Sequence, residues 1–185
     1  MPFAPVGLRP GQADDPLGSY PRGLVPPSPS IRTLEPVFSR GDGDGWTECA
    51  LGHRHWGLFG AAGLLLWHGE RILMQHRAQW SHHGGTWGLL GGARHRAETA
   101  EQAAGREAAE ESGLDPRCYA VIGHFVDDHG GWSYTTVVAR TELALTPTSL
   151  AAESIEVRWV PVAEVAALPL HPGFAATWEQ VRALA

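Results

Sequence analysis

The chain has 185 residues and a formal net charge of −6, and its 14 basic residues are all arginine. An acidic chain is a poor candidate for sequence-independent nucleic-acid binding, which needs a basic surface. Its longest apolar run, residues 57–67, is too short to span a bilayer, so no membrane partner is expected. Two cysteines make no disulfide framework, and no secretory signal is visible, so we expect a cytoplasmic protein.

Residues 1–45 differ in composition from the rest of the chain. They hold nine of the 14 prolines and end in alternating glycine and aspartate at 41–45. Such a stretch makes neither long helices nor central strands. We therefore predict an N-terminal arm or tail over residues 1–45 and one domain over residues 46–185.

Apolar runs separated by turn residues predict the strands of this domain. The expected strands are 59–67 and 71–77, joined as a hairpin, then 119–126 and 132–140, joined by a turn at 127–131, and finally 156–160. A helix is predicted over Thr99–Ser112, with a capping box at its start and Gly113 as its stop. Further helices are expected at 162–168 and 175–184. Strands, helix, strands and helix in this order predict an α+β or α/β fold with a mixed sheet flanked by helices.

The helix over residues 99–112 has an unusual face. At about 100° per residue, one stripe runs from alanine in its first half to carboxylates in its second, with Glu110 at its border. Its members are Ala100, Ala103, Ala104, Glu107 and Glu111. Burying several like charges together is unfavourable unless a cation neutralises them, and clustered hard oxygens suit Mg²⁺ or Mn²⁺. The alternative is a solvent-exposed acidic helix end, since most glutamate-rich helices are exposed faces.

The spacing of these residues favours the metal site. The fixed positions are Gly92, Glu98, Arg106, Glu107, Glu110, Glu111 and Gly113. This order resembles the Nudix box, G-x5-E-x7-R-E-U-x-E-E-x-G-U, in which U is aliphatic, and all seven fixed positions match. The likeness extends over residues 57–185. Leu90 stands where the family usually has proline, and a looser loop is expected there.

The resemblance implies a Nudix-like α/β/α sandwich that hydrolyses a nucleoside diphosphate linked to another group. It implies a divalent ion, Mg²⁺ or Mn²⁺, held by Glu107, Glu110 and Glu111 with the carbonyl of Gly92. The implied catalytic residues are Glu107, Glu110 and Arg106, and the implied general base is one of the box glutamates or one from a later loop. Apart from the resemblance, Glu153 or Glu156 near the late strand could supply an extra metal ligand or base, and a solvent-facing side chain is the alternative. The implied structural residues of the motif are Glu98 and Gly113.

Three residues outside the box are candidates for substrate binding. They are Arg77, His83 and Trp132. His83 precedes the glycine-rich stretch and could touch a phosphate or base, whereas Trp132 could stack on a nucleobase. The alternatives are a surface loop for His83 and cross-strand packing for Trp132.

The expected substrate is a small nucleotide. No coenzyme A signature precedes Gly92, and His129 occupies the position of the proline that often marks ADP-ribose enzymes. These departures favour a (deoxy)nucleoside triphosphate or an oxidised nucleotide, cleaved to a nucleoside monophosphate. ADP-ribose or nucleotide-sugar hydrolysis and a non-catalytic nucleotide-binding module remain the alternatives, and the sequence leaves open whether the chain forms a homodimer.

Cys49, His53 and His55 form a C-x3-H-x-H pattern near the start of the domain. These are zinc-binding residue types, but tetrahedral sites need a closed set of ligands, and no fourth is evident nearby in sequence. The sequence therefore favours ordinary polar residues over a zinc site.

Overall fold

The structure of the protein is a computed structural model that describes residues 41–185. The predicted arm over residues 1–45 lies outside the described residues except for 41–45. The strands are β1 (Trp46–Glu48), β2 (Arg54–Trp56), β3 (Ala61–His68), β4 (Arg71–Arg77), β5 (Trp87–Gly88), β6 (Leu90–Ala93), β7 (Ala120–Asp128), β8 (Ser133–Arg140) and β9 (Ser154–Pro161). The helices are α1 (Ala100–Ser112), a 3-10 turn at Pro116–Cys118, α2 (Val162–Val165) and α3 (Pro172–Arg182). None of the helices at 41–185 is long and apolar enough to cross a membrane.

Strand β3 lies at the centre of a mixed sheet. It pairs in parallel with β8 and antiparallel with β4 and β6, while β7 pairs antiparallel with β8. Strands β5 and β9 pair antiparallel with β4. All residues of β3 except the last are buried, which is typical of a strand covered on both faces. The predicted mixed sheet is therefore confirmed.

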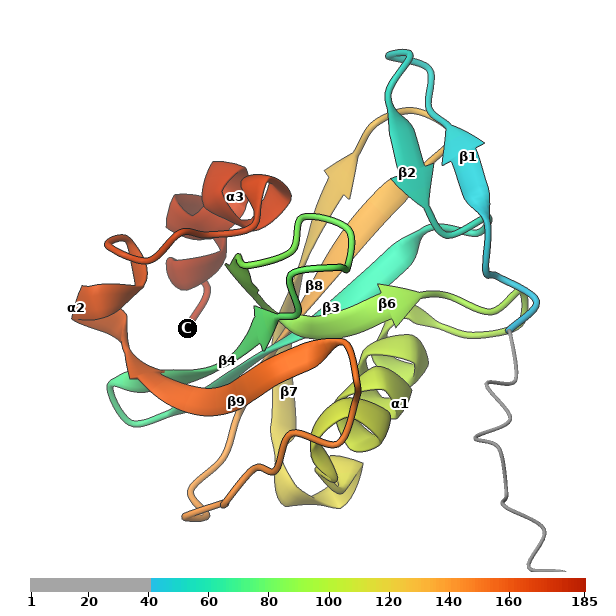
Figure 1. Cartoon of the computed structure of the whole chain (residues 1–185). Coiled ribbons are helices and arrows are strands. Elements are labelled where there is room, and N and C mark those ends of the chain that lie inside the picture. Colours follow the sequence, from blue (N-terminus) through green and yellow to red (C-terminus); the bar gives the residue numbers. More distant parts are fainter. Residues whose placement is uncertain (1–40) are drawn as a thin grey trace, which may run out of the picture. The chain divides into compact units, whose positions relative to one another are not determined.

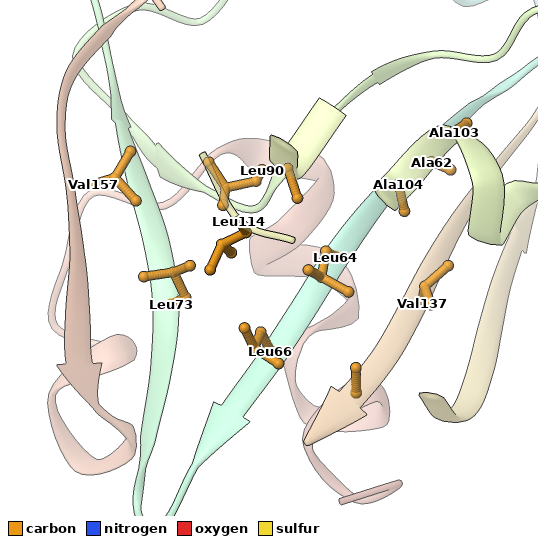
Figure 2. Close-up of a cluster of buried hydrophobic side chains, with 12 residues drawn as sticks. Ala62, Leu64, Leu66, Leu73, Leu90, Ala103, Ala104, Leu114, Val137 and Val157 are labelled. Carbon is orange, nitrogen blue, oxygen red and sulfur yellow. The ribbon is translucent and has the colours of Figure 1, made fainter. Parts of the chain in front are cut away.

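Helices cover the two faces of this sheet (Figure 1). Leu64 and Leu66 of β3 lie in one buried cluster with Ala103 and Ala104 of α1 (Figure 2). Leu65 and Trp67, which alternate with them, lie in a second cluster with Phe174, Trp178 and Val181 of α3. Side chains alternate across a strand, so α1 and α3 pack on opposite faces. This is the predicted α/β/α sandwich.

Local capping sets the ends of α1. The Thr99 side chain accepts a hydrogen bond from the backbone of Gln102, whose side chain accepts one from the backbone of Thr99. At the other end Gly113 has a φ of 72°, the left-handed conformation that glycine adopts without steric cost. Both predicted caps are confirmed.

The segment before the box differs from its prediction. Residues 90–93 form β6, in which Leu90 pairs with Leu64 and is buried. The expectation that Leu90 loosens this loop is wrong, because a leucine keeps its backbone N–H and fills the core beneath α1. The sequence also gave no sign of the short hairpin β1–β2, in which Trp46 pairs with Trp56.

Candidate active site

Helix α1 carries the acidic residues to the edge of strand β6. Ala103, Ala104 and Ala108 are fully buried against the sheet, and the same face continues into Glu107 and Glu111. Glu111 is only 8% exposed. The helix therefore buries its alanine stripe and takes two carboxylates with it, as the periodicity predicts.

Glu111 is a buried carboxylate. It accepts hydrogen bonds from Nε2 of Gln75 at 2.8 Å and from the backbone N–H of Gly91 at 3.0 Å. Burial, with a smaller contribution from the neighbouring Glu107, raises the pKa of Glu111 to about 8, because the two hydrogen bonds and Arg77 oppose the rise only in part. The ionised form needs an additional positive charge beside it.

The carboxylate of Glu107 lies directly against Gly92. A Cβ atom at position 92 would lie 2.5 Å from Oε1 of Glu107, so any residue larger than glycine would displace this carboxylate. Nη1 of Arg106 donates to the same oxygen at 2.8 Å, yet burial raises the pKa of Glu107 above its ordinary value. Glu110 completes the group, with a side chain 61% exposed and 3.5 Å from Nη1 of Arg106.

Arg106 joins the helix to the loop before it. Its Nε and Nη2 atoms donate to the two carboxylate oxygens of Glu98 at 2.7 and 3.0 Å, and Nη2 also donates to the carbonyl of Ala93 at 2.9 Å. Glu98 in turn accepts from the backbone N–H of His95. The Arg106 hydrogen bonds, offset in part by burial, hold the pKa of Glu98 at about 2.

Replacing Glu98 by glutamine is expected to lower the free energy of unfolding by about 2 kcal/mol at pH 7. The pKa of Glu98 falls from 4.5 to about 2 on folding, so its ionised form stabilises the fold above pH 4.5. This contribution is lost as the pH falls through about 2, so the wild type and the variant should converge in acid. Urea unfolding at pH 7, 4 and 3 measures the difference, and Glu142→Gln, at an exposed position, is the control. A difference that is the same at all three pH values would contradict the ion pair.

A family model described as the NUDIX domain matches residues 58–181. The chain belongs to the Nudix family. A protein of two Mycobacterium tuberculosis strains, named as a putative 8-oxo-dGTP diphosphatase, is 51% identical to this chain over 162 residues. The alignment covers 80% of this chain and 74% of the relative. A nucleoside triphosphate pyrophosphatase/Nudix hydrolase fusion protein of Bifidobacterium longum is 37% identical over 90% of this chain and 35% of the relative. The crystal structure of the Nudix hydrolase RenU of M. smegmatis has a TM-score of 0.71 and 46% identity, covering 77% of this chain and 94% of RenU.

The donor set of the Nudix box fits a divalent cation. Glu107 and Glu111 lie against Gly92 and Gly91 of β6, and the exposed Glu110 stands between them in sequence on the same helix. Glu111 is buried without a basic residue in hydrogen-bonding contact among residues 41–185, and Gly92 leaves room for the carboxylate of Glu107. Hard, anionic oxygens of this kind suit Mg²⁺ and Mn²⁺.

Two of the three predicted substrate-binding residues, Arg77 and His83, lie at the end of β4 and in the loop that follows it. Arg77 ends β4, where its charge lowers the pKa of Glu111, and its Nε donates to the carbonyl of His82 at 3.0 Å. His83 has a left-handed φ of 54°, and its ring centroid lies 4.7 Å from that of His171.

Trp132 lies at the hairpin β1–β2. Its ring stacks on His55 with centroids 3.9 Å apart, and its Nε1 donates to the carbonyl of Gly57. Within residues 41–185, these contacts connect it to the hairpin and not to the box glutamates.

The sequence did not identify Gln75 as part of the site of this Nudix domain. Gln75 is fully buried in β4, and its Nε2 lies 2.8 Å from Glu111 and 2.6 Å from Oγ of Ser154 in β9. It therefore connects the box helix to two strands. The one available signal was a polar residue directly after the apolar run Ile72–Met74 of a predicted strand.

Proposed function

We propose that the protein hydrolyses (deoxy)nucleoside triphosphates, oxidised purine nucleotides among them, to a nucleoside monophosphate and pyrophosphate with Mg²⁺ or Mn²⁺. The observation that carries the proposal is the meeting of Glu107 and Glu111, two largely buried carboxylates, beside Gly92. Membership of the Nudix family supports the pyrophosphohydrolase chemistry. The substrate class is supported by 51% identity to a relative named for 8-oxo-dGTP.

Each box residue has a role in this proposal. Glu107, Glu110 and Glu111, with the carbonyl of Gly92, hold the ion, which would neutralise the pyrophosphate oxygens of the substrate. Arg106 orients Glu107 through its 2.8 Å hydrogen bond. Water attacks one phosphorus of the α–β anhydride, the bridging P–O bond breaks, and a glutamate accepts the proton of the water. We propose that this reaction takes place in the cytoplasm, the location expected from the sequence.

Groups that suit an anionic substrate lie at the end of β4. Arg77 supplies a positive charge there, and the rings of His82, His83 and His171 are neighbours. Burial, then nearby charges, lowers the pKa of His171 to about 4, so its ring is neutral at pH 7. Its Nδ1 accepts a hydrogen bond from the backbone N–H of Gly173 at 3.2 Å, which leaves Nε2–H as a donor toward an acceptor atom of the substrate.

A substrate panel with product identification tests the proposal. The panel holds the common nucleoside triphosphates, 8-oxo-dGTP, ADP-ribose and a nucleotide sugar, each with Mg²⁺, with Mn²⁺ and with chelator. We expect pyrophosphate and a nucleoside monophosphate from triphosphates, only when the ion is present. If ADP-ribose or the nucleotide sugar were turned over faster than the triphosphates, the proposed substrate class would be wrong. Binding without turnover across the panel would instead indicate a non-catalytic module.

A further inference from the structure

Four side chains of zinc-binding types meet on the side of the domain that holds the hairpin β1–β2. Cys49 follows β1, His53 precedes β2, and His55 lies within β2. His129 comes from the turn between β7 and β8, which lies beside the hairpin (Figure 1). One potential ligand atom from each of the four lies within 4.8 Å of the others. The fourth ligand that the local sequence lacks is therefore supplied by a segment distant in sequence.

Backbone hydrogen bonds bring the two segments together. The N–H of Cys49 donates to the carbonyl of His53 at 3.0 Å and closes the hairpin. The N–H of Ala50 donates to the carbonyl of Gly130 at 2.8 Å and connects the hairpin to the turn that carries His129. The four side chains thus converge through contacts that do not depend on them.

The orientation of two imidazole rings points to a shared ligand. His55 is stacked on Trp132, with centroids 3.9 Å apart and planes 9° from parallel. Oδ2 of Asp127 lies 3.1 Å from Nε2 of His129, the carboxylate contact that commonly orients a metal-binding histidine. Nδ1 of His129 and Nε2 of His55 are buried and have no hydrogen-bond partner among residues 41–185. Buried polar atoms without partners are rare, and here two of them belong to the same cluster.

We propose that Cys49, His53, His55 and His129 bind a Zn²⁺ ion in a closed, tetrahedral site. Zinc bonds of about 2.3 Å to sulfur and about 2.0 Å to nitrogen place tetrahedral ligand atoms about 3.3–3.6 Å apart, so small side-chain rotations complete the shell. On binding, the thiol of Cys49 loses its proton to solvent and the imidazoles bind as neutral rings.

The ligand types separate this site from the Nudix box. One thiolate and three imidazoles suit Zn²⁺, whereas Mg²⁺ prefers the carboxylates of the box. Four protein ligands leave no position for substrate, which is the composition of a structural site. The ion therefore cross-links the hairpin β1–β2 to the turn between β7 and β8, and it stabilises the fold without taking part in the hydrolysis.

Cobalt binding by the full chain, expressed without a histidine tag, tests the proposal. Excess Mg²⁺ occupies the box while Co²⁺ is added to metal-free protein. We expect one Co²⁺ per chain, with the intense visible absorption of tetrahedral cobalt and a thiolate charge-transfer band in the near ultraviolet, both lost on addition of one equivalent of Zn²⁺. Zinc should also raise the melting temperature. Absence of the charge-transfer band at saturating Co²⁺ overturns the proposal.

Two variants and two controls assign the site. Cys49→Ser should abolish the charge-transfer band, and His53→Ala should abolish the tetrahedral spectrum and the zinc-dependent rise in melting temperature. Cys49 is buried, so its variant could fail to fold; His53 is exposed and its side chain makes no hydrogen bond within residues 41–185. Cys118→Ser, which changes the other cysteine, and His124→Ala, which removes an exposed histidine of β7, should bind cobalt like the wild type. If the His53→Ala variant keeps the tetrahedral spectrum, or if Cys118→Ser loses the charge-transfer band, the proposed site is wrong.

Discussion

Replacing Glu107 by glutamine is expected to lower kcat/KM for nucleotide hydrolysis by about 10³-fold while the fold is retained. Glutamine keeps the oxygen that accepts the 2.8 Å hydrogen bond from Nη1 of Arg106, and it has nearly the same volume against Gly92. What it removes is a negative charge that the proposed ion needs. Initial rates of pyrophosphate release at saturating Mg²⁺, together with far-ultraviolet circular dichroism, measure the two effects.

The matched control for this variant is Glu101→Gln. Glu101 lies on the same helix, in its first turn, and its exposed side chain contacts His124 and not the box. Its replacement should leave kcat/KM within about twofold, because an exposed ion pair contributes little. If kcat/KM of Glu107→Gln were within tenfold of the wild-type value, Glu107 would not be a catalytic residue.

The sequence predicts the box helix well because its determinants are local. Thr99 and Gln102 cap each other across one turn, Gly113 ends the helix, and the alanine stripe defines the buried face. None of these features depends on a distant segment. The same holds for the hairpin β3–β4, whose predicted connection is confirmed by the pairing of Trp67 with Ile72.

Features that depend on distant segments escaped prediction. Residues 90–93, which include two glycines, form a strand only because β3 pairs with them. Gln75 joins the site because it hydrogen-bonds to Glu111 of α1, and Ser154 approaches it because β9 pairs with β4. The place of His129 beside Cys49 was likewise not predictable, because the two residues are distant in sequence and no local pattern relates them. The spacing of a motif thus predicts the carboxylates, but only the sheet register supplies the groups around them.

Replacing Glu111 by glutamine is expected to stabilise the protein when divalent ions are absent, by about 2 kcal/mol at pH 7. Burial raises the pKa of Glu111 from 4.5 to about 8, so the wild type must take up a proton on folding between these pH values. Its free energy of unfolding therefore falls as the pH rises from 4.5 to 8. Glutamine is neutral throughout, and this contribution disappears.

Addition of Mg²⁺ should reverse the order of stability. The wild type gains the free energy of binding an ion to its folded form, whereas Glu111→Gln has lost one proposed ligand and gains less. The variant should also be nearly inactive. Urea unfolding in chelator and in saturating Mg²⁺, at pH 5, 6, 7 and 8, measures both effects on the same samples.

The difference between wild type and variant cancels the contribution of the titrating histidines. The pKa values of His55, His82 and His171 are lowered, first by burial in each case, so all three make stability rise with pH, but equally in both proteins. Glu110→Gln is the matched control, since this side chain is 61% exposed and its loss should change the ion-free free energy of unfolding by less than about 0.5 kcal/mol. Parallel pH profiles for the wild type and Glu111→Gln in chelator would show that the buried carboxylate is satisfied without a cation, and the main reason for placing an ion beside it would be lost.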